Sequence, residues 1–166
     1  MIVNERVVSY INSLDRGNSD ICNIIEKEAI EDQVPIIRKE MGNLLKVLLK
    51  LKQPKSILEV GTAVGYSSIL MSENMPVDCK IVTIENYDKR IPIARNNIKR
   101  AGKEDCIQLI EGDAMEVLKE LEGPFDFIFM DAAKGQYLNW LPMVLDLMPK
   151  GAVLISVSYT HLRAHE

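Results

Sequence analysis

SILEVGTAVGYSS, residues 56–68 of the chain, joins a short apolar strand to a helix through a turn that holds two glycines. Glycine lets the backbone turn tightly and approach a ligand, and a helix N-terminus presents free N–H groups to an anion. The glycines are spaced G-x-x-x-G, unlike the G-x-G-x-x-G of dinucleotide sites, and Glu59 at the strand end could hold an ammonium. Ser67 and Ser68 could receive a carboxylate. The stretch therefore predicts a nucleotide-like cofactor with an amino-acid moiety; an ordinary strand–turn–helix connection is the alternative.

The chain on both sides of this stretch predicts an α/β fold. From Ser56 onward, short β-rich runs alternate with helical stretches, and the runs read SILEV, KIVTIE, CIQLIE, FDFIFMD and AVLIS. Strands of continuous apolar character, each followed by a helix, are typical of a parallel sheet covered on both faces. We expect a doubly wound sheet.

The first fifty residues predict helices, because apolar residues recur there at spacings of three and four between breaks at Pro35 and Pro54. We expect one domain over residues 1–156, with a helical cap in 1–52 and the sheet core in 53–156. The pattern stops after Ser156, and both histidines, His161 and His165, lie beyond it. We expect residues 157–166 to be a non-native tail that replaces the last strands of the sheet.

Composition excludes several classes of function. A net charge of −4 argues against nucleic-acid binding driven by bulk charge, although a local basic patch stays possible. With histidine confined to the last six residues, Ser-His-Asp, Cys-His and His-ligated zinc chemistry are excluded from the body of the chain. Three scattered cysteines and the lack of a long apolar run predict a cytoplasmic protein with no membrane segment.

Three further positions carry candidate chemistry at predicted strand ends. Glu85 ends the second strand, where an acid can accept both hydroxyls of a ribose. Gly112-Asp113-Ala114 follows the third strand and could meet an adenine edge, although Asp113 would serve equally well as a helix N-cap.

The fourth strand ends at Asp131, and Lys134 follows within one turn. A carboxylate there suits a hard divalent cation, and a lysine beside a metal can accept a proton from a substrate hydroxyl. A structural ion pair is the alternative. Tyr137 and Trp140 could stack on a flat substrate or simply be core aromatics.

The motifs ILEVGTAVGYSS, strand-end Glu85, GDA and MDAAK resemble the cation-dependent class I S-adenosylmethionine O-methyltransferases, the group of the catechol and caffeoyl-coenzyme A enzymes, which have a Rossmann-like sheet. Within that group VPI, NNIK and DAAKGQY look closest to bacterial tRNA 5-hydroxyuridine methyltransferases. The resemblance implies an S-adenosylmethionine site made of Ile37, Glu59, Gly61, Thr62, Ser67, Glu85, Asp113, Ala114 and Asp131.

The same resemblance implies that Asp131 is a Mg²⁺ ligand, that Lys134 is the base or charge partner, and that the intact protein is a homodimer. The family completes the metal site with an Asp-Asn pair after the fifth strand, where this sequence has Val157-Ser158. We therefore expect an incomplete metal site and essentially no turnover by the chain as given.

Several functions follow from these features. The first is methylation of 5-hydroxyuridine at the wobble position of tRNA, with a phosphate contact at a basic cluster made of Lys89, Arg90, Arg95, Lys99, Arg100 and Lys103. A solvated helix face is the alternative for that cluster. The second function is methylation of a small catechol-like or caffeoyl-coenzyme A-like acceptor. The third is a non-catalytic nucleoside-binding fold, and a nicotinamide oxidoreductase is less favoured because of the glycine spacing and Glu59.

Overall fold

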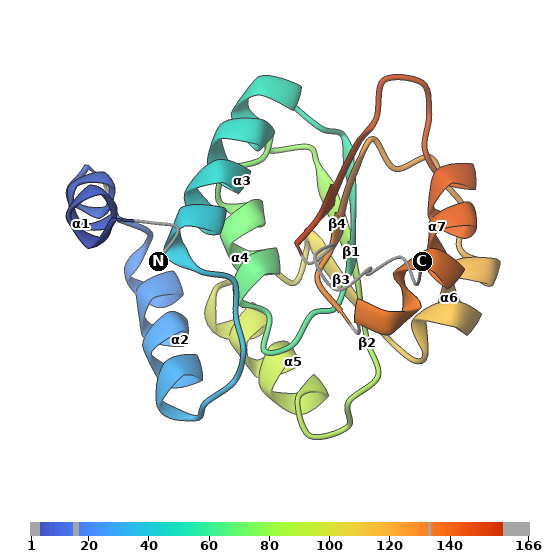
Figure 1. Cartoon of the computed structure of the whole chain (residues 1–166). Coiled ribbons are helices and arrows are strands. Elements are labelled where there is room, and N and C mark those ends of the chain that lie inside the picture. The colour runs from blue at the N-terminus through green and yellow to red at the C-terminus, as the bar shows by residue number, and fades with distance from the viewer. Residues whose placement is uncertain (1–3, 15–16, 133, 158–166) are drawn as a thin grey trace, which may run out of the picture.

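The computed structural model describes residues 4–14, 17–132 and 134–157 of the chain (Figure 1). Its helices are α1 (Glu5–Ser13), α2 (Asp20–Glu31), α3 (Lys39–Lys52), α4 (Tyr66–Ser72), α5 (Ile91–Arg100), α6 (Ala114–Glu120) and α7 (Tyr137–Asp146), with a 3₁₀ turn η1 (Lys134–Gln136). Its strands are β1 (Ser56–Val60), β2 (Lys80–Glu85), β3 (Ile107–Glu111), β4 (Phe127–Met130) and β5 (Val153–Ser156).

The strands form one parallel sheet in the order β3-β2-β1-β4-β5. This confirms the predicted doubly wound α/β sheet. The chain moves outward from β1 to β3, then returns to the other side of β1 with β4, so the order reverses between β1 and β4. Ligands of open α/β sheets bind at such a switch point, beside the carboxyl ends of the strands.

Helices cover both faces of the sheet, with α2 to α5 on one face and α6 and α7 on the other (Figure 1). Successive strand residues point to opposite faces, so Ile57 packs with Leu45 and Ile69 on the first face, whereas Leu58 packs with Val144 on the second. Both faces are therefore dry, which explains why the strands read as continuous apolar runs.

The N-terminal helices α2 and α3 are present as the sequence predicted, and they adjoin the sheet core directly. α2 and α3 pack beside α4 and join the helical layer on one face of the sheet. An amphipathic stripe shows that one side of a helix is buried, but not which element buries it. Of the residues before β1 that the structure describes, those that line the cleft at the carboxyl ends of the strands are Pro35–Arg38 and Met41.

Among the helices of the described residues, none is both long and apolar enough to cross a membrane.

Candidate functional site

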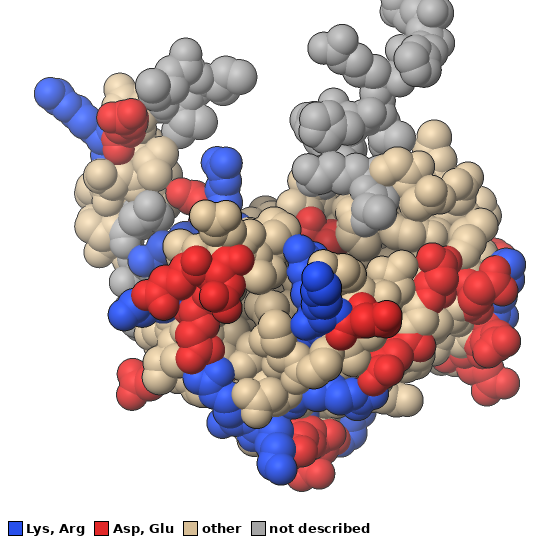
Figure 2. All heavy atoms as spheres, turned by 90° about the horizontal axis from the view of Figure 1, so that it is seen from below, with Lys and Arg blue, Asp and Glu red and all other residues tan. Residues whose placement is uncertain are grey.

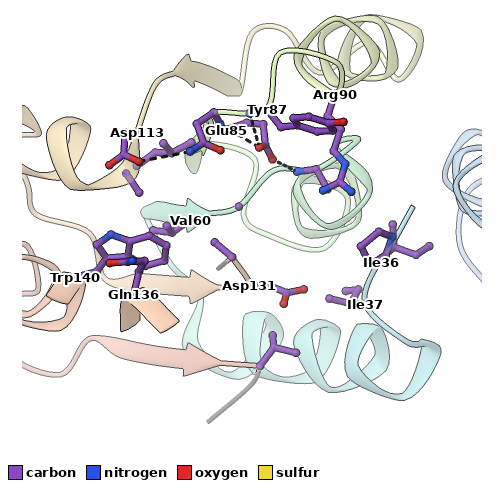
Figure 3. A pocket seen from close by; sticks show the side chains of 18 of the residues that line it. Ile36, Ile37, Val60, Glu85, Tyr87, Arg90, Asp113, Asp131, Gln136 and Trp140 are labelled. Carbon is purple, nitrogen blue, oxygen red and sulfur yellow. Dashed lines mark hydrogen bonds between the residues drawn. The ribbon is translucent and has the colours of Figure 1, made fainter. Parts of the chain in front are cut away.

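A cleft of about 1480 Å³ runs along the carboxyl ends of the strands (Figure 3). Its walls are the ends of β1, β2, β3 and β4, the start of α6, part of η1 and α7, and the connection before α3. Of the residues predicted to form the cofactor site, those that line the cleft are Ile37, Gly61, Glu85, Asp113, Ala114 and Asp131. The structure thus brings together six positions that are spread over almost a hundred residues of sequence.

Gly61 is the point where the two halves of the sheet meet most closely. Its φ is +104°, and a Cβ built there would lie 2.5 Å from the carbonyl oxygen of Asp131 and 3.0 Å from the Cβ of Ala132. The N–H groups of Gly61 and Thr62 both donate to the carbonyl oxygen of Ile84, at 3.0 and 3.1 Å. Only glycine fits this position, because a side chain would push the end of β4 away from the end of β1.

Glu59 lies behind the cleft wall and has no exposed surface. Its carboxylate accepts hydrogen bonds from the hydroxyls of Ser67 and Thr83, each at 2.5 Å, and from the hydroxyl of Ser68. Burial raises the pKa of Glu59 to about 7, against the effect of these hydroxyls, and the nearby Asp131 adds to the rise.

The same network explains the position of two other predicted cofactor residues. Thr62 and Thr83 share a hydrogen bond of 2.5 Å between their hydroxyls, and Thr83 in turn donates to Glu59. Thr62 is buried and Ser67 nearly so. Glu59, Thr62 and Ser67 therefore hold one another beneath the glycine loop in this structure, instead of lining the cleft as the sequence predicted.

Glu85 is on the cleft wall, but most of its carboxylate is already in use. One oxygen accepts the N–H groups of Asn86 and Tyr87, at 3.1 and 3.0 Å, and the other accepts the N–H of Ala63 at 2.7 Å. A carboxylate offers about four lone-pair positions, so three backbone donors leave about one for a ligand. The geometry suits one ribose hydroxyl better than the two that we expected.

Asp113 is the helix N-cap that the sequence allowed, and it also lies on the cleft wall. Its Oδ1 accepts the N–H of Met115 at 2.8 Å and so caps α6, and its side chain also lines the cleft. Ala114, the first residue of α6, is nearly buried beside it. Capping fixes the orientation of the Asp113 carboxylate at this end of the cleft.

The two aromatic residues after β4 are both buried in the core cluster on the α6–α7 face of the sheet, with their ring centres 6.0 Å apart. Tyr137 is buried, and its hydroxyl donates to the carbonyl oxygen of Met130 at 3.1 Å. Burial, and then the Asp131 carboxylate, raise the pKa of Tyr137. Trp140 lines the cleft from α7, opposite the side where Arg90 lies (Figure 3). Both are thus core residues: Tyr137 supports the strand end, and Trp140, which is also buried, borders the cleft from the core.

The predicted metal site rests on Asp131 alone. Between residues 4 and 157, apart from the positions left out, no group of three or more His, Cys, Asp or Glu side chains could hold a metal ion. Glu85 and Asp113 each accept backbone N–H groups instead. The described residues therefore do not fit Mg²⁺, which prefers six oxygen ligands. The side chain of Lys134 and all of Ser158 lie outside the described part, while Val157 lines the cleft.

Several cleft residues were not singled out from the sequence. Arg38 and Met41 come from the start of α3, and Tyr87 and Arg90 lie between β2 and α5. The guanidinium of Arg90 lies 5.2 Å from the centre of the Tyr87 ring, a cation–π contact. The sequence places Arg90 in the basic cluster, and no pattern there distinguishes it from its neighbours as a residue that would line the cleft.

The basic cluster is less available for a phosphate contact than the sequence suggests, because two of its arginines form ion pairs. Arg95 pairs with Glu111 at 2.6 Å, and Arg100 pairs with Glu28 at 2.7 Å. Figure 2, which views the molecule from below Figure 1, shows positive and negative side chains interspersed on this face. The structure therefore gives a mixed surface instead of a continuous basic patch.

Comparison with known proteins identifies relatives along nearly the whole chain. Residues 19–160 match the family model described as "O-methyltransferase". A catechol O-methyltransferase of Niastella koreensis is 34% identical over 92% of this chain and 72% of its own length. A caffeoyl-CoA O-methyltransferase of Medicago sativa is 37% identical over 68% of this chain, which spans 48% of that protein.

Solved structures agree with the sequence relatives. The SAH-bound Podospora anserina methyltransferase PaMTH1 superposes with a TM-score of 0.87 at 30% identity, over 92% of this chain and 68% of that one. The Bacillus cereus O-methyltransferase in complex with SAH superposes with a TM-score of 0.83 at 28% identity, over 91% and 71%. The chain therefore belongs to the O-methyltransferase family.

Proposed function

We propose that this chain binds S-adenosylmethionine in the cleft and forms the cofactor-binding part of an O-methyltransferase. The observation that carries the proposal is the convergence of Gly61, Glu85 and Asp113 on one cleft at the switch point between β1 and β4. Similar structures support it: the Bacillus cereus enzyme is in complex with SAH, and TomG of Streptomyces achromogenes, with a TM-score of 0.83 at 30% identity, is in complex with SAM.

The cleft residues suggest how the cofactor would lie. Glu85 would accept a ribose hydroxyl at its remaining lone pair, and Asp113 and Ala114 would meet the adenine edge. Ile37 would cover the amino-acid end beside Gly61. Glu59 and Ser67 would act from behind the loop, since the structure has them bonded to each other.

When bound, the cofactor supplies a methyl group on a positively charged sulfur. The chain's own part is to align the acceptor oxygen with that methyl group and to accept the hydroxyl proton, which we assign to Asp131 and Lys134. Because the described residues do not fit a magnesium site, no step is assigned to a metal.

For the acceptor we propose 5-hydroxyuridine in tRNA, supported by the DAAKGQY motif at residues 131–137. A second candidate is a catechol or caffeoyl-coenzyme A-like phenol, which the names of the sequence relatives favour. A non-catalytic nucleoside-binding fold remains the third.

Calorimetry tests the cofactor assignment. Glu85→Ala should weaken binding of S-adenosylhomocysteine about tenfold or more, because one charge-assisted hydrogen bond and the anchor of the loop at Ala63 are lost. Glu111 pairs in register with Glu85 one strand away but does not line the cleft, so Glu111→Ala is the matched control. Equal affinity in the Glu85 variant, or tighter binding of NADH, would show that the site is wrongly assigned.

Methyl transfer to tRNA and to catechol, measured side by side, tests the acceptor. A version extended with the family's C-terminal part should methylate tRNA, with affinity that falls steeply as salt rises, whereas the chain as given should show essentially no turnover. Transfer to catechol alone would favour the second candidate. Equal activity of the two versions would show that the metal-site argument is wrong.

A further inference from the structure

Asn97 is a buried amide on α5 that touches the glycine loop from behind. Its side chain is only 3% exposed, and its Nδ2 donates to the carbonyl oxygen of Val64 at 2.9 Å. Val64 lies between Gly61 and Gly65, in the loop that forms one wall of the cleft, while Asn97 itself does not line the cleft. The contact therefore reaches the proposed cofactor loop from outside the site.

Arg100 fixes the orientation of the Asn97 amide. One guanidinium nitrogen of Arg100 donates to the Asn97 Oδ1 at 2.9 Å. Arginine can only donate and a carbonyl can only accept, so the amide must place Oδ1 toward Arg100 and Nδ2 toward Val64.

Glu28 holds Arg100 in turn. The two guanidinium ends donate to the two carboxylate oxygens of Glu28, at 2.7 and 2.9 Å, which is the paired geometry that restricts an arginine most strongly. A chain of hydrogen bonds thus runs from α2 through Glu28, Arg100 and Asn97 to the Val64 carbonyl.

The loop needs support on this side. On the cleft side its N–H groups are held by Ile84 and Glu85. Behind it lies a second, smaller hollow of about 370 Å³ between α2 and α5, whose lining includes Val64, Asn97 and Arg100. The hydrogen bond from Asn97 gives the buried Val64 carbonyl a partner and so holds this peptide from the side of α5.

We propose that Asn97 is a positioning residue for the cofactor site: its amide holds the 61–65 loop in the binding conformation, and the Glu28–Arg100 pair holds the amide. The identity of the ligand that this loop binds rests on the proposed function. The role of Asn97 in holding the loop does not depend on that function, since its hydrogen bonds are present without any ligand.

Asn97→Asp is the sharpest variant. It keeps the size of the side chain and the bond to Arg100, but replaces the donor to Val64 by an oxygen that repels the carbonyl. Asn96→Ala is the control, because Asn96 is an exposed neighbour on the same helix. Two quantities are measured well below the unfolding temperature: the affinity for S-adenosylhomocysteine, and hydrogen exchange of the amides of residues 61–65 relative to those of β1.

Asn97→Asp should weaken S-adenosylhomocysteine binding about tenfold and speed exchange in residues 61–65 about tenfold, with β1 unchanged. Arg100→Ala should have a smaller effect in the same direction. Asn96→Ala should change neither quantity.

The outcomes separate this inference from the proposed function. If the unmodified chain binds S-adenosylhomocysteine and Asn97→Asp binds it equally well, the positioning role is wrong and the cofactor assignment stands. If the unmodified chain fails to bind it, the proposed function fails. Hydrogen exchange then tests whether Asn97 holds the loop. Faster exchange in Asn97→Asp that is confined to residues 61–65 supports the positioning role, and unchanged exchange overturns it.

Discussion

Glu59 is a carboxyl group that is sealed from solvent, so its ionisation should affect the stability of the fold. Burial raises its pKa from 4.5 to about 7, which means that the folded state holds the proton more tightly than the unfolded state does. Its contribution to stability is complete below pH 4.5 and is lost as the pH rises through 7. A difference of about 2.5 in pKa corresponds to a loss of about 3 kcal/mol over that interval.

Glu59→Gln isolates this effect, because a glutamine can stay among the same hydroxyls without ionising. Urea unfolding of both proteins at pH 5, 6, 7 and 8 gives the difference in unfolding free energy at each pH. We expect that difference to move in favour of the variant by about 2 to 3 kcal/mol between pH 5 and pH 8, because part of the loss has already occurred at pH 5. A difference that stays constant across this range would contradict the assignment.

Gly61 predicts a second effect at the level of one residue. Gly61→Ala forces a Cβ against the carbonyl of Asp131, in addition to the strain of a positive φ. Gly102 also has a positive φ, of +62°, but has no atom within 4 Å of its ideal Cβ, so Gly102→Ala measures strain alone. Thermal unfolding should show Gly61→Ala to be less stable than Gly102→Ala by about 1–3 kcal/mol. Equal losses would mean that β1 and β4 can separate freely.

The residue scale also shows where sequence reasoning reached its limit. Glycines and strand-end acids could be recognised, because their positions follow from the turn and from the ends of apolar runs. The burial of Glu59 among three hydroxyls could not be predicted, because both faces of the sheet are covered and the alternation of β1 does not distinguish them. Glu85 was correctly placed at the cleft, but its three backbone partners depend on a fold-specific approach of the loop that no pattern reveals.

At the scale of elements, Asp126 ties the start of β4 to the start of β1. Its carboxylate accepts the N–H groups of Lys55 and Ser56, both at 3.1 Å, and lies 3.8 Å from the ammonium of Lys52. Asp126→Ala leaves these N–H groups without their partner and should cost about 2 kcal/mol in urea unfolding.

Two variants bracket that value. Asp126→Asn keeps an acceptor and should cost less than Asp126→Ala. Asp78→Ala removes an exposed carboxylate just before β2, at the same edge of the sheet, and should change stability by no more than about 0.5 kcal/mol. A loss in Asp126→Ala as small as that of Asp78→Ala would show that the tie does not stabilise the sheet.

The elements themselves were largely predictable. The five apolar runs became the five strands, since a strand covered on both faces must be apolar throughout. The periodic stretches became α2 and α3. What could not be predicted was the packing of α2 and α3 beside α4, because this depends on contacts between residues far apart in sequence.

At the scale of the whole molecule, α1 stands apart from the two apolar clusters (Figure 1). Val7, Tyr10, Ile11 and Leu14 recur at helical spacing and are 46–65% exposed. Hydrogen exchange should therefore be fast throughout α1 and slow in β1 and β4. Protection of α1 that grows with protein concentration would instead indicate that a second copy of the chain covers this face.

The contact between Gly61 and Asp131 has a consequence for how the protein is made. β1 leaves the ribosome early, but its neighbour β4 and the carbonyl that rests on Gly61 are encoded about seventy residues later. At roughly 5–20 residues per second, translation leaves that edge of β1 without its partner for about 4–14 s. The nascent chain thus carries an open, apolar strand edge throughout that interval, and the binding cleft exists only after β4 emerges.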